Sequence, residues 1–341
     1  MDCARRSIRS SARVAREPLL SVEDLNVRFA TRRGTVHAVN GITFDIAPGE
    51  TLGIVGESGC GKSVTSLAIL GLLARNGRVE SGHVWFAGKD LIRQSDRALR
   101  KIRGREIAMI FQDPMSSLNP VLTVGRQIRE ALETHFDMDR KEAEATAVEA
   151  LDRVGIPSAK ARVKDYPHQF SGGMRQRAMI AMALSCRPRL LIADEPTTAL
   201  DVTTQAQILD LLRDLQEEFA MAIMLITHDL GVAAQVADDV AVMYLGEVVE
   251  FGPATSVLTA PKHPYTQALV RSVPRLGHRG RDRMQAVRGT VPPPYERPSG
   301  CRFHPRCDQF MAGACDRLVP ERVRSDDTEV ACLLYDGEEK R

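Results

Sequence analysis

Hydrophobic positions along the chain predict strands that alternate with helices. Residues 19–29 and 36–46 alternate apolar and polar side chains, as half-buried strands do. Residues 126–154 repeat their apolar side chains at a spacing near 3.6, which predicts a helical region. Four short apolar runs have the length of buried strands: 51–55, 107–111, 190–193 and 222–227. This alternation indicates an α/β fold with a largely parallel sheet that is covered on both faces.

A glycine-rich loop separates the strand at 51–55 from a helix expected at 64–73. Its sequence, Gly56-Glu57-Ser58-Gly59-Cys60-Gly61-Lys62-Ser63, fits the pattern G-x-x-x-x-G-K-[ST] at every fixed position. A plain connecting turn would not need all of these positions. The glycines let backbone N–H groups converge on nucleotide phosphates, and the helix start adds the positive end of its dipole. Lys62 supplies a positive charge and Ser63 a hydroxyl ligand for Mg²⁺. The expected nucleotide contacts are Gly56, Ser58, Gly59, Cys60, Gly61, Lys62, Ser63 and Val64.

The strand at 190–193 runs into two adjacent carboxylates, Asp194 and Glu195. A phosphate loop needs a carboxylate at the end of a neighbouring strand to hold Mg²⁺, and Asp194 suits that role. Glu195, one residue further, suits the role of a general base that polarises the attacking water. The alternative is an acidic pair that only caps the turn at 196–198. The phosphate loop upstream favours the catalytic interpretation.

Composition and charge limit the classes of protein that remain. The 341 residues suffice for two domains, and 43% hydrophobic with 26% charged residues is typical of a globular protein. The net charge of +2 gives no reason to expect a nucleic acid as partner. No apolar run reaches the roughly 20 residues that cross a bilayer. Residues 1–18 are rich in arginine without an apolar core, so we expect a disordered basic tail of an intracellular protein, not a secretory signal.

Proline, arginine and cysteine become dense after about residue 252, which predicts a domain boundary near Pro253, with domains at 19–253 and 254–341. Four of the seven cysteines lie in the second domain: Cys301, Cys307, Cys315 and Cys332. In an intracellular chain, four clustered thiols favour a metal over disulfides. Thiolates suit either zinc or an iron–sulfur cluster, and the spacing lacks the paired C-x₂-C of common zinc sites. Free thiols packed in a small domain are the alternative.

Further motifs resemble those of ATP-binding cassette (ABC) proteins, in the order which that family requires. Residues 170–177 (Phe-Ser-Gly-Gly-Met-Arg-Gln-Arg) resemble the family signature, with Met174 where the general form has glutamine. Gln112 resembles the Q-loop glutamine, and residues 199–201 (Ala-Leu-Asp) resemble the D-loop. His228 resembles the switch histidine, and Phe29 the aromatic residue that stacks on adenine. The resemblance covers residues 19–253.

This resemblance implies a P-loop NTPase of the ABC type, with a RecA-like core, an antiparallel β subdomain and a helical subdomain at about 113–170. Two cassettes pair head to tail in the family. Ser171, Gly172 and Gly173, at a capped helix start, would therefore face the γ-phosphate of ATP on the partner cassette. The Met174 variant is similar to that of oligopeptide importers and does not imply inactivation.

The resemblance also implies roles for the remaining motif residues. Gln112 would reach Mg²⁺ or the attacking water, and His228 would contact the γ-phosphate; each has a plain structural alternative as a loop or strand-end residue. Asp201 has two interpretations that do not exclude each other, a contact across the dimer and the N-cap of a helix at 202–212. Phe29 at a strand end can equally serve packing. The expected catalytic residues are Glu195, His228 and Lys62.

Three segments, at 56–59, 112–120 and 261–266 (Pro-Lys-His-Pro-Tyr-Thr), resemble ATPase subunits of dipeptide and oligopeptide importers, and nickel importers share much of this pattern. The resemblance implies two transmembrane permease subunits, a second homologous ATPase, a solute-binding protein and a place at the cytoplasmic face of the membrane. Residues 113–120 and the helices up to Tyr166 would form the permease-docking surface. Some ATPases of this type carry a [4Fe–4S] cluster at similar cysteines, which favours that cluster here as a structural staple. The alternative function is a soluble ABC ATPase acting on DNA or ribosomes.

Overall fold

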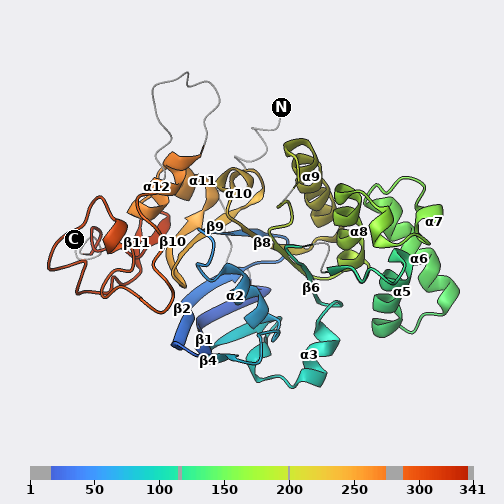
Figure 1. Ribbon diagram of the computed structural model, residues 1–341, viewed down its shortest axis with the longest axis horizontal. Helices are drawn as coiled ribbons and strands as arrows, with labels where there is room; N and C mark the ends of the chain where they lie inside the picture. Colours follow the sequence, from blue (N-terminus) through green and yellow to red (C-terminus); the bar gives the residue numbers. More distant parts are fainter. Residues whose placement is uncertain (1–16, 114–116, 199, 274–286, 337–341) are drawn as a thin grey trace.

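The strands form two sheets in the computed structural model, which describes residues 17–113, 117–198, 200–273 and 287–336 (Figure 1). The smaller sheet consists of β1 (Leu20–Thr31), β2 (Gly34–Ile46), β4 (Gly77–Phe86) and β5 (Lys89–Asp90). Its order is β2-β1-β4-β5, and every pairing in it is antiparallel. This sheet is the antiparallel β subdomain that the ABC resemblance implies.

The larger sheet has eight strands among the described residues: β3 (Thr51–Val55), β6 (Ile107–Ile110), β7 (Leu190–Asp194), β8 (Ala222–Thr227), β9 (Asp239–Tyr244), β10 (Glu247–Pro253), β11 (Val323–Ser325) and β12 (Thr328–Val330). The strands from β9 through β3, β8 and β7 to β6 are parallel. Every residue of β3, β7, β8 and β9 is buried, which explains why these strands are continuous apolar runs. The predicted parallel α/β core is therefore confirmed.

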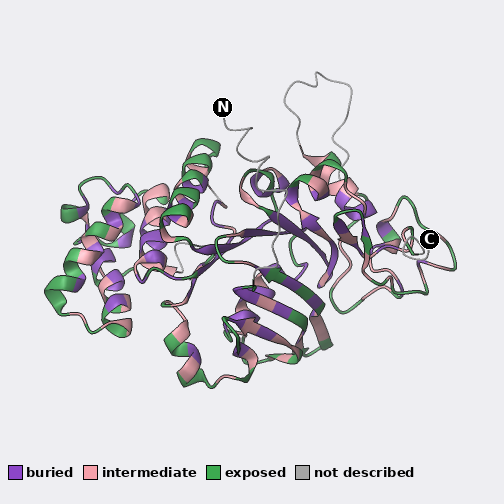
Figure 2. Ribbon diagram, turned by 180° about the vertical axis from the view of Figure 1, so that it is seen from behind, coloured by how far each residue is buried: buried purple, intermediate pink, exposed green. Residues whose placement is uncertain are grey.

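Ten α-helices are described: α2 (Lys62–Ile69), α3 (Asp96–Ile102), α5 (Val124–His135), α6 (Arg140–Arg153), α7 (Ala159–Arg162), α8 (Gly172–Leu184), α9 (Val202–Phe219), α10 (Leu230–Val236), α11 (Ala254–Thr259) and α12 (Pro264–Ser272). The 3₁₀ turns are Leu91–Arg93, Pro167–Gln169 and His304–Arg306. Helices α5, α6 and α7 gather beside α8 at the end of the larger sheet that β6 occupies (Figure 1). Figure 2 shows the central strands buried and the outer helix faces exposed.

Three helix predictions differ from the structure in their bounds. The helix expected at 202–212 continues to Phe219. The single helical region expected at 126–154 is two helices, because Asp139 starts a new one: its carboxylate accepts hydrogen bonds from the backbone N–H groups of Lys141 and Glu142, each at 2.8 Å. The helix expected at 64–73 ends at Ile69. Gly71 follows with a φ of 62°, a left-handed conformation that ends helices.

The described part of residues 254–341, here called the C-terminal segment, joins the larger sheet. Its hairpin β11–β12 pairs with β10, with Glu250 opposite Val330. Strand β10 ends at Pro253, where the sequence predicts the domain boundary. The domain bounds themselves stay a prediction, as does the role of the basic tail, whose residues 1–16 lie outside the described part. Among the described residues, no helix has the length and apolar character to span a membrane.

Candidate nucleotide-binding site

The sheet register brings the phosphate loop and the acidic pair to the same edge of the larger sheet. Val55, the last residue of β3, pairs with Thr227 of β8, and Asp194 of β7 pairs with Ile226 of β8. The segments that follow these parallel strands therefore emerge side by side. This edge is where open α/β sheets bind their ligands.

The phosphate loop depends on glycine at two positions where other chain segments approach closely. A Cβ atom on Gly56 would lie 2.3 Å from the Met243 carbonyl oxygen, and one on Gly61 would lie 2.5 Å from the Ala38 carbonyl oxygen. Gly61 has a φ of 106° and precedes α2 without a side-chain cap. The first N–H groups of α2 are therefore not capped by a side chain and suit a phosphate as ligand.

Lys62 and Ser63 lie where phosphate and Mg²⁺ chemistry requires them. The buried Lys62 ammonium donates to the carbonyl oxygens of Gly56 at 2.7 Å and Glu57 at 3.2 Å, which folds it over the loop. The Ser63 hydroxyl donates to Asp194 Oδ1 at 3.1 Å. Burial raises the pKa of Asp194, and the Ser63 hydrogen bond opposes that effect. A hydroxyl and a carboxylate in contact beside a phosphate loop fit the oxygen donors that Mg²⁺ prefers.

Three side chains from different parts of the chain meet at the Glu195 carboxylate. Its Oε2 accepts hydrogen bonds from Gln112 Nε2 at 3.0 Å and from the Thr198 hydroxyl at 2.8 Å. Its Oε1 lies 3.2 Å from Nδ1 of His228. Burial would raise the pKa of Glu195, but the hydrogen bonds from Thr198 and His228 outweigh it and hold the pKa below its usual value. The carboxylate is therefore ionised at neutral pH, as a general base must be.

Thr198 is a site residue that sequence reasoning missed. It lies three residues after Glu195, in the turn at 196–198, and that spacing is the signal that could have found it. Glu195 itself has a φ of 47°, and its N–H donates to the carbonyl oxygen of Ile226 at 2.8 Å. The constrained backbone and the hydroxyl together direct the carboxylate toward Gln112 and His228.

The signature residues lie at the start of α8. Ser171 is the N-cap, and its hydroxyl accepts from the Met174 N–H at 3.3 Å. The side chain of the buried Gln176 donates to the Pro196 carbonyl oxygen at 2.5 Å, which ties α8 to the turn after the acidic pair. Gly172 and Gly173 form the first turn of the helix, so its first N–H groups suit a second anion. The contact with a partner's ATP stays a prediction.

For two further predicted site residues, Asp201 and Phe29, the structure shows a structural role. Asp201 caps α9 and accepts from the Thr204 N–H at 2.9 Å and the Thr204 hydroxyl at 2.7 Å, while its contact across a dimer stays a prediction. Ala199 of the same motif lies outside the described residues. The Phe29 ring covers Gly77 of β4, where a Cβ atom would lie 2.5 Å from the ring. Packing is therefore observed for Phe29, and stacking on adenine stays a prediction.

The four clustered cysteines line one small cavity, together with His263, His304 and Phe303. Burial raises the pKa of the Cys301 thiol to about 11 and that of the Cys332 thiol to about 12. The described cysteines are free, so no disulfide joins them. However, no group of three or more His, Cys, Asp or Glu side chains in the described ranges is placed to hold a metal ion. The arrangement therefore does not support the predicted iron–sulfur cluster, although it brings Cys301, Cys307, Cys315 and Cys332 together.

Comparisons with known proteins agree with this geometry. A family model of ABC transporters matches residues 39–198, and a model of the C-terminal region of oligopeptide/dipeptide transporters matches residues 249–315. The dipeptide transport ATP-binding protein DppD of Bacillus subtilis is 53% identical over 94% of this chain and 96% of its own length. DppD of Haemophilus influenzae is 49% identical over 92% of this chain and 94% of its own length.

Two solved structures share the fold. A dimeric, post-hydrolysis state of the ATP-binding cassette MJ0796 bound to ADP and phosphate has a TM-score of 0.62 and 28% identity, covering 69% of this chain and 98% of that one. The cassette cbiO1 of Clostridium perfringens has a TM-score of 0.62 and 31% identity, covering 72% of this chain and 92% of its own. Fold and site define an ATPase of the P-loop class. The chain belongs to the ABC transporter family, as one of its ATP-binding proteins.

Proposed function

We propose that this chain hydrolyses Mg·ATP to power the import of dipeptides or oligopeptides across a membrane. The observation that carries the ATPase mechanism is the meeting of Gln112, Thr198 and His228 at the Glu195 carboxylate. The peptide cargo rests on the relatives named as dipeptide transport proteins and on the match at 249–315. Nickel importers of similar sequence are the competing interpretation.

The mechanism follows from what each side chain can do. Lys62 offsets the negative charge of the β- and γ-phosphates, while Ser63 and Asp194 would hold Mg²⁺, which neutralises charge on the transferred phosphoryl group. Glu195 accepts a proton from the attacking water as that water approaches the γ-phosphate. His228 lies 3.2 Å from the same carboxylate and orients it, and its imidazole is available to hydrogen-bond the γ-phosphate.

The partners follow from the same proposal. The chain would pair with a second homologous ATPase and act with two permease subunits and a solute-binding protein, at the cytoplasmic face of the membrane. Phe111 and Val121, near the two ends of the segment at 113–120, expose apolar side chains, and so does Tyr166 at the end of the helical region; these support a permease-docking surface there. Gln127 braces that segment through both its amide atoms, which contact Asn119. Pro114, Met115 and Ser116 of the segment lie outside the described residues.

Co-purification tests the transport proposal. The tagged chain, extracted from its native cells in a mild detergent, should retain two multi-span membrane proteins, a second cassette ATPase and a solute-binding protein. ATP hydrolysis by the reconstituted complex should then rise when the binding protein is loaded with peptide and not when Ni²⁺ is added. Stimulation by Ni²⁺ alone would refute the peptide cargo. Ribosomal or DNA-repair partners without membrane proteins would refute transport.

We propose further that residues 254–341 form a unit stabilised by a group bound at the four cysteines. The shared cavity and the match at 249–315, which includes three of these cysteines, support this proposal. A bound metal would offset the raised thiol pKa values of Cys301 and Cys332, because metal ligation favours thiolates. Iron, acid-labile sulfide and zinc are measured on chain purified without oxygen, with Cys301→Ser as control. Iron with sulfide indicates a cluster, zinc alone indicates a zinc site, and neither indicates free thiols.

A further inference from the structure

The second residue of the phosphate loop, Glu57, is held by two side chains of the C-terminal segment. Arg306 donates from Nη1 to Glu57 Oε2 at 2.7 Å and from Nη2 to Glu57 Oε1 at 3.0 Å, a bidentate ion pair. The backbone N–H of Glu57 donates to the Tyr265 hydroxyl at 2.9 Å. Tyr265 is fully buried, and the Arg306 side chain is only 4% exposed. A residue within the ATP site therefore depends on a region far along the chain.

The Arg306 guanidinium is fixed by its other contacts as well. Its Nε donates to the Arg288 carbonyl oxygen at 2.7 Å, and Nη2 reaches the Gly289 carbonyl oxygen at 3.3 Å. The group also lies over the rings of Tyr244 and Phe303, 5.8 and 5.9 Å from their centroids. These contacts already restrict the rotamers of the buried Arg306 side chain. Its planar guanidinium is therefore preorganised to form two parallel hydrogen bonds with the Glu57 carboxylate.

Tyr265 is positioned by the motif at 261–266. The buried Glu250 of β10 accepts the backbone N–H groups of Lys262 at 2.7 Å and His263 at 2.9 Å. Nδ1 of His263 then accepts the Tyr265 N–H at 3.0 Å. The Tyr265 ring packs against Tyr244 at a centroid distance of 4.8 Å. This motif thus serves to deliver one phenol hydroxyl to the phosphate loop.

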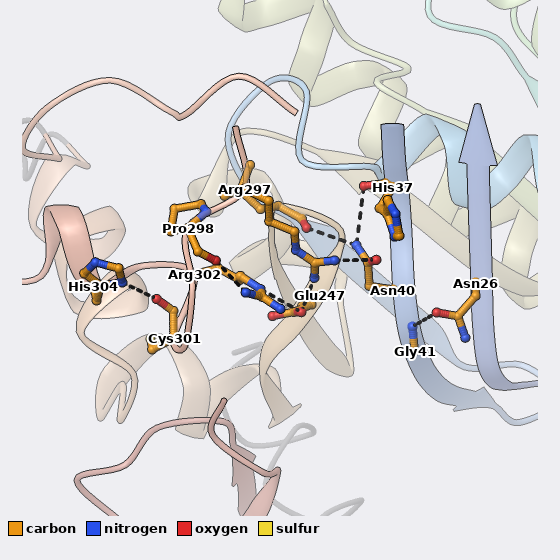
Figure 3. Close-up of polar contacts among 11 residues, drawn as sticks. Asn26, His37, Asn40, Gly41, Glu247, Arg297, Pro298, Cys301, Arg302 and His304 are labelled. Atoms are coloured by element: carbon orange, nitrogen blue, oxygen red, sulfur yellow. Dashed lines mark hydrogen bonds and ion pairs between the residues drawn. The ribbon is translucent and has the colours of Figure 1, made fainter. Parts of the chain in front are cut away.

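A second set of contacts from the same segment supports the loop indirectly (Figure 3). Arg297 forms an ion pair with Glu247 and donates to Asn40 Oδ1 at 2.6 Å. Asn40 and Glu247 flank the turn between β9 and β10, where the Gly246 N–H donates to the Cys60 carbonyl oxygen of the phosphate loop at 2.9 Å. The C-terminal segment therefore contacts the phosphate loop directly and also contacts the turn that holds it.

We propose that Arg306 and Tyr265 are positioning residues for ATP, and that Arg306 neutralises a charge that would otherwise oppose ATP binding. Glu57 places a carboxylate in the loop that must accept a polyanionic triphosphate, and like charges repel each other. The bidentate pair with Arg306 cancels that charge and holds the carboxylate in place. The proposal rests only on ATP binding, which is common to this family. Its test therefore does not depend on which solute is transported.

The test compares Arg306→Met with the double variant Arg306→Met/Glu57→Gln in the full-length chain. Mg·ATP affinity is measured by calorimetry, with thermal melting to check folding. Arg306→Met should weaken ATP binding on the order of tenfold, or about 1.4 kcal/mol, because Glu57 becomes an unpaired anion. The double variant should recover most of this loss, because the offending charge is gone. A purely structural role for Arg306 would not be rescued in this way.

Arg322→Met is the matched control. It removes a partly buried arginine of the C-terminal segment that is paired with Glu329 and the Thr43 carbonyl oxygen and not with the phosphate loop. Its Mg·ATP affinity should stay within twofold of wild type. High salt should reduce the difference in Mg·ATP affinity between Arg306→Met and wild type, since salt screens the repulsion between Glu57 and the phosphates.

Two milder variants keep the proposal testable if Arg306→Met does not fold. Arg306→Lys retains a charge without the bidentate geometry, so its affinity should lie between wild type and Arg306→Met. Tyr265→Phe keeps the ring and removes the acceptor for the Glu57 N–H; it should weaken ATP binding severalfold with little change in kcat at saturating ATP. Wild-type affinity in all three single variants, or a double variant as weak as Arg306→Met, would overturn the proposal.

Discussion

Replacement of the buried Glu250 tests how firmly the C-terminal segment is attached to the ATPase sheet. Its carboxylate is fully buried on β10 and accepts two backbone N–H groups, from Lys262 and His263. A hydrogen bond to a charged group contributes about 1.5–3 kcal/mol. Glu250→Gln keeps one acceptor oxygen and turns an N–H₂ group toward the second backbone donor. It should therefore lower the free energy of unfolding by about 1.5–3 kcal/mol, and Glu250→Ala by about 3–6 kcal/mol.

The effect of Glu250→Gln should depend on pH. Burial raises the pKa of Glu250 in the folded protein above its unfolded value, so the folded state binds the proton more tightly. As the pH falls through the folded pKa toward the usual glutamate range, the wild-type protein therefore gains stability that the Gln variant cannot gain. The difference in free energy of unfolding between wild type and Glu250→Gln should be larger near pH 5 than at pH 8.

Urea unfolding at both pH values measures these differences. Glu217→Gln, at an exposed position on α9, is the matched control and should change stability by less than about 0.5 kcal/mol. Losses below about 0.5 kcal/mol in both Glu250 variants would refute the assigned hydrogen bonds. If Glu250→Gln loses the same free energy of unfolding at pH 5 and at pH 8, the raised pKa of Glu250 is refuted.

The remaining predictions concern the catalytic centre. Glu195→Gln should lower ATP hydrolysis by about 10²–10⁴-fold while Mg·ATP affinity stays near wild type, measured by phosphate release and calorimetry; unchanged turnover would exclude Glu195 as the base. Gln112→Ala removes one hydrogen bond to Glu195 and should lower turnover by roughly fivefold, for a bond worth about 1 kcal/mol. Burial raises the pKa of Asp194, so its carboxylate should protonate at a higher pH than an ordinary aspartate. The affinity for Mg²⁺, measured across pH, should therefore fall on acidification before an ordinary aspartate would protonate. Ser171→Ala should cost about 0.5–2 kcal/mol of stability in thermal unfolding through the lost cap of α8.

Local sequence rules predicted the elements that carry chemistry. The phosphate loop could be predicted from its glycines, because close backbone contacts at Gly56 and Gly61 exclude any side chain there. The buried strands β3, β7 and β8 are readable because a covered parallel sheet requires continuous apolar runs. The break between α5 and α6 was missed, although Asp139 is an ordinary cap, because the apolar spacing continues across it.

The sequence by itself thus determined the ABC fold, the phosphate loop and the identity of the acidic pair, since each depends on neighbouring residues along the chain. Only the tertiary structure decided how the site residues contact one another and which distant residues support them. Gln112 and His228 reach Glu195 because parallel strands end at one edge of the sheet, and Arg306 reaches Glu57 across 249 positions of sequence. Such pairings leave no local pattern, because they are selected by packing and charge between segments that only the folded chain brings together.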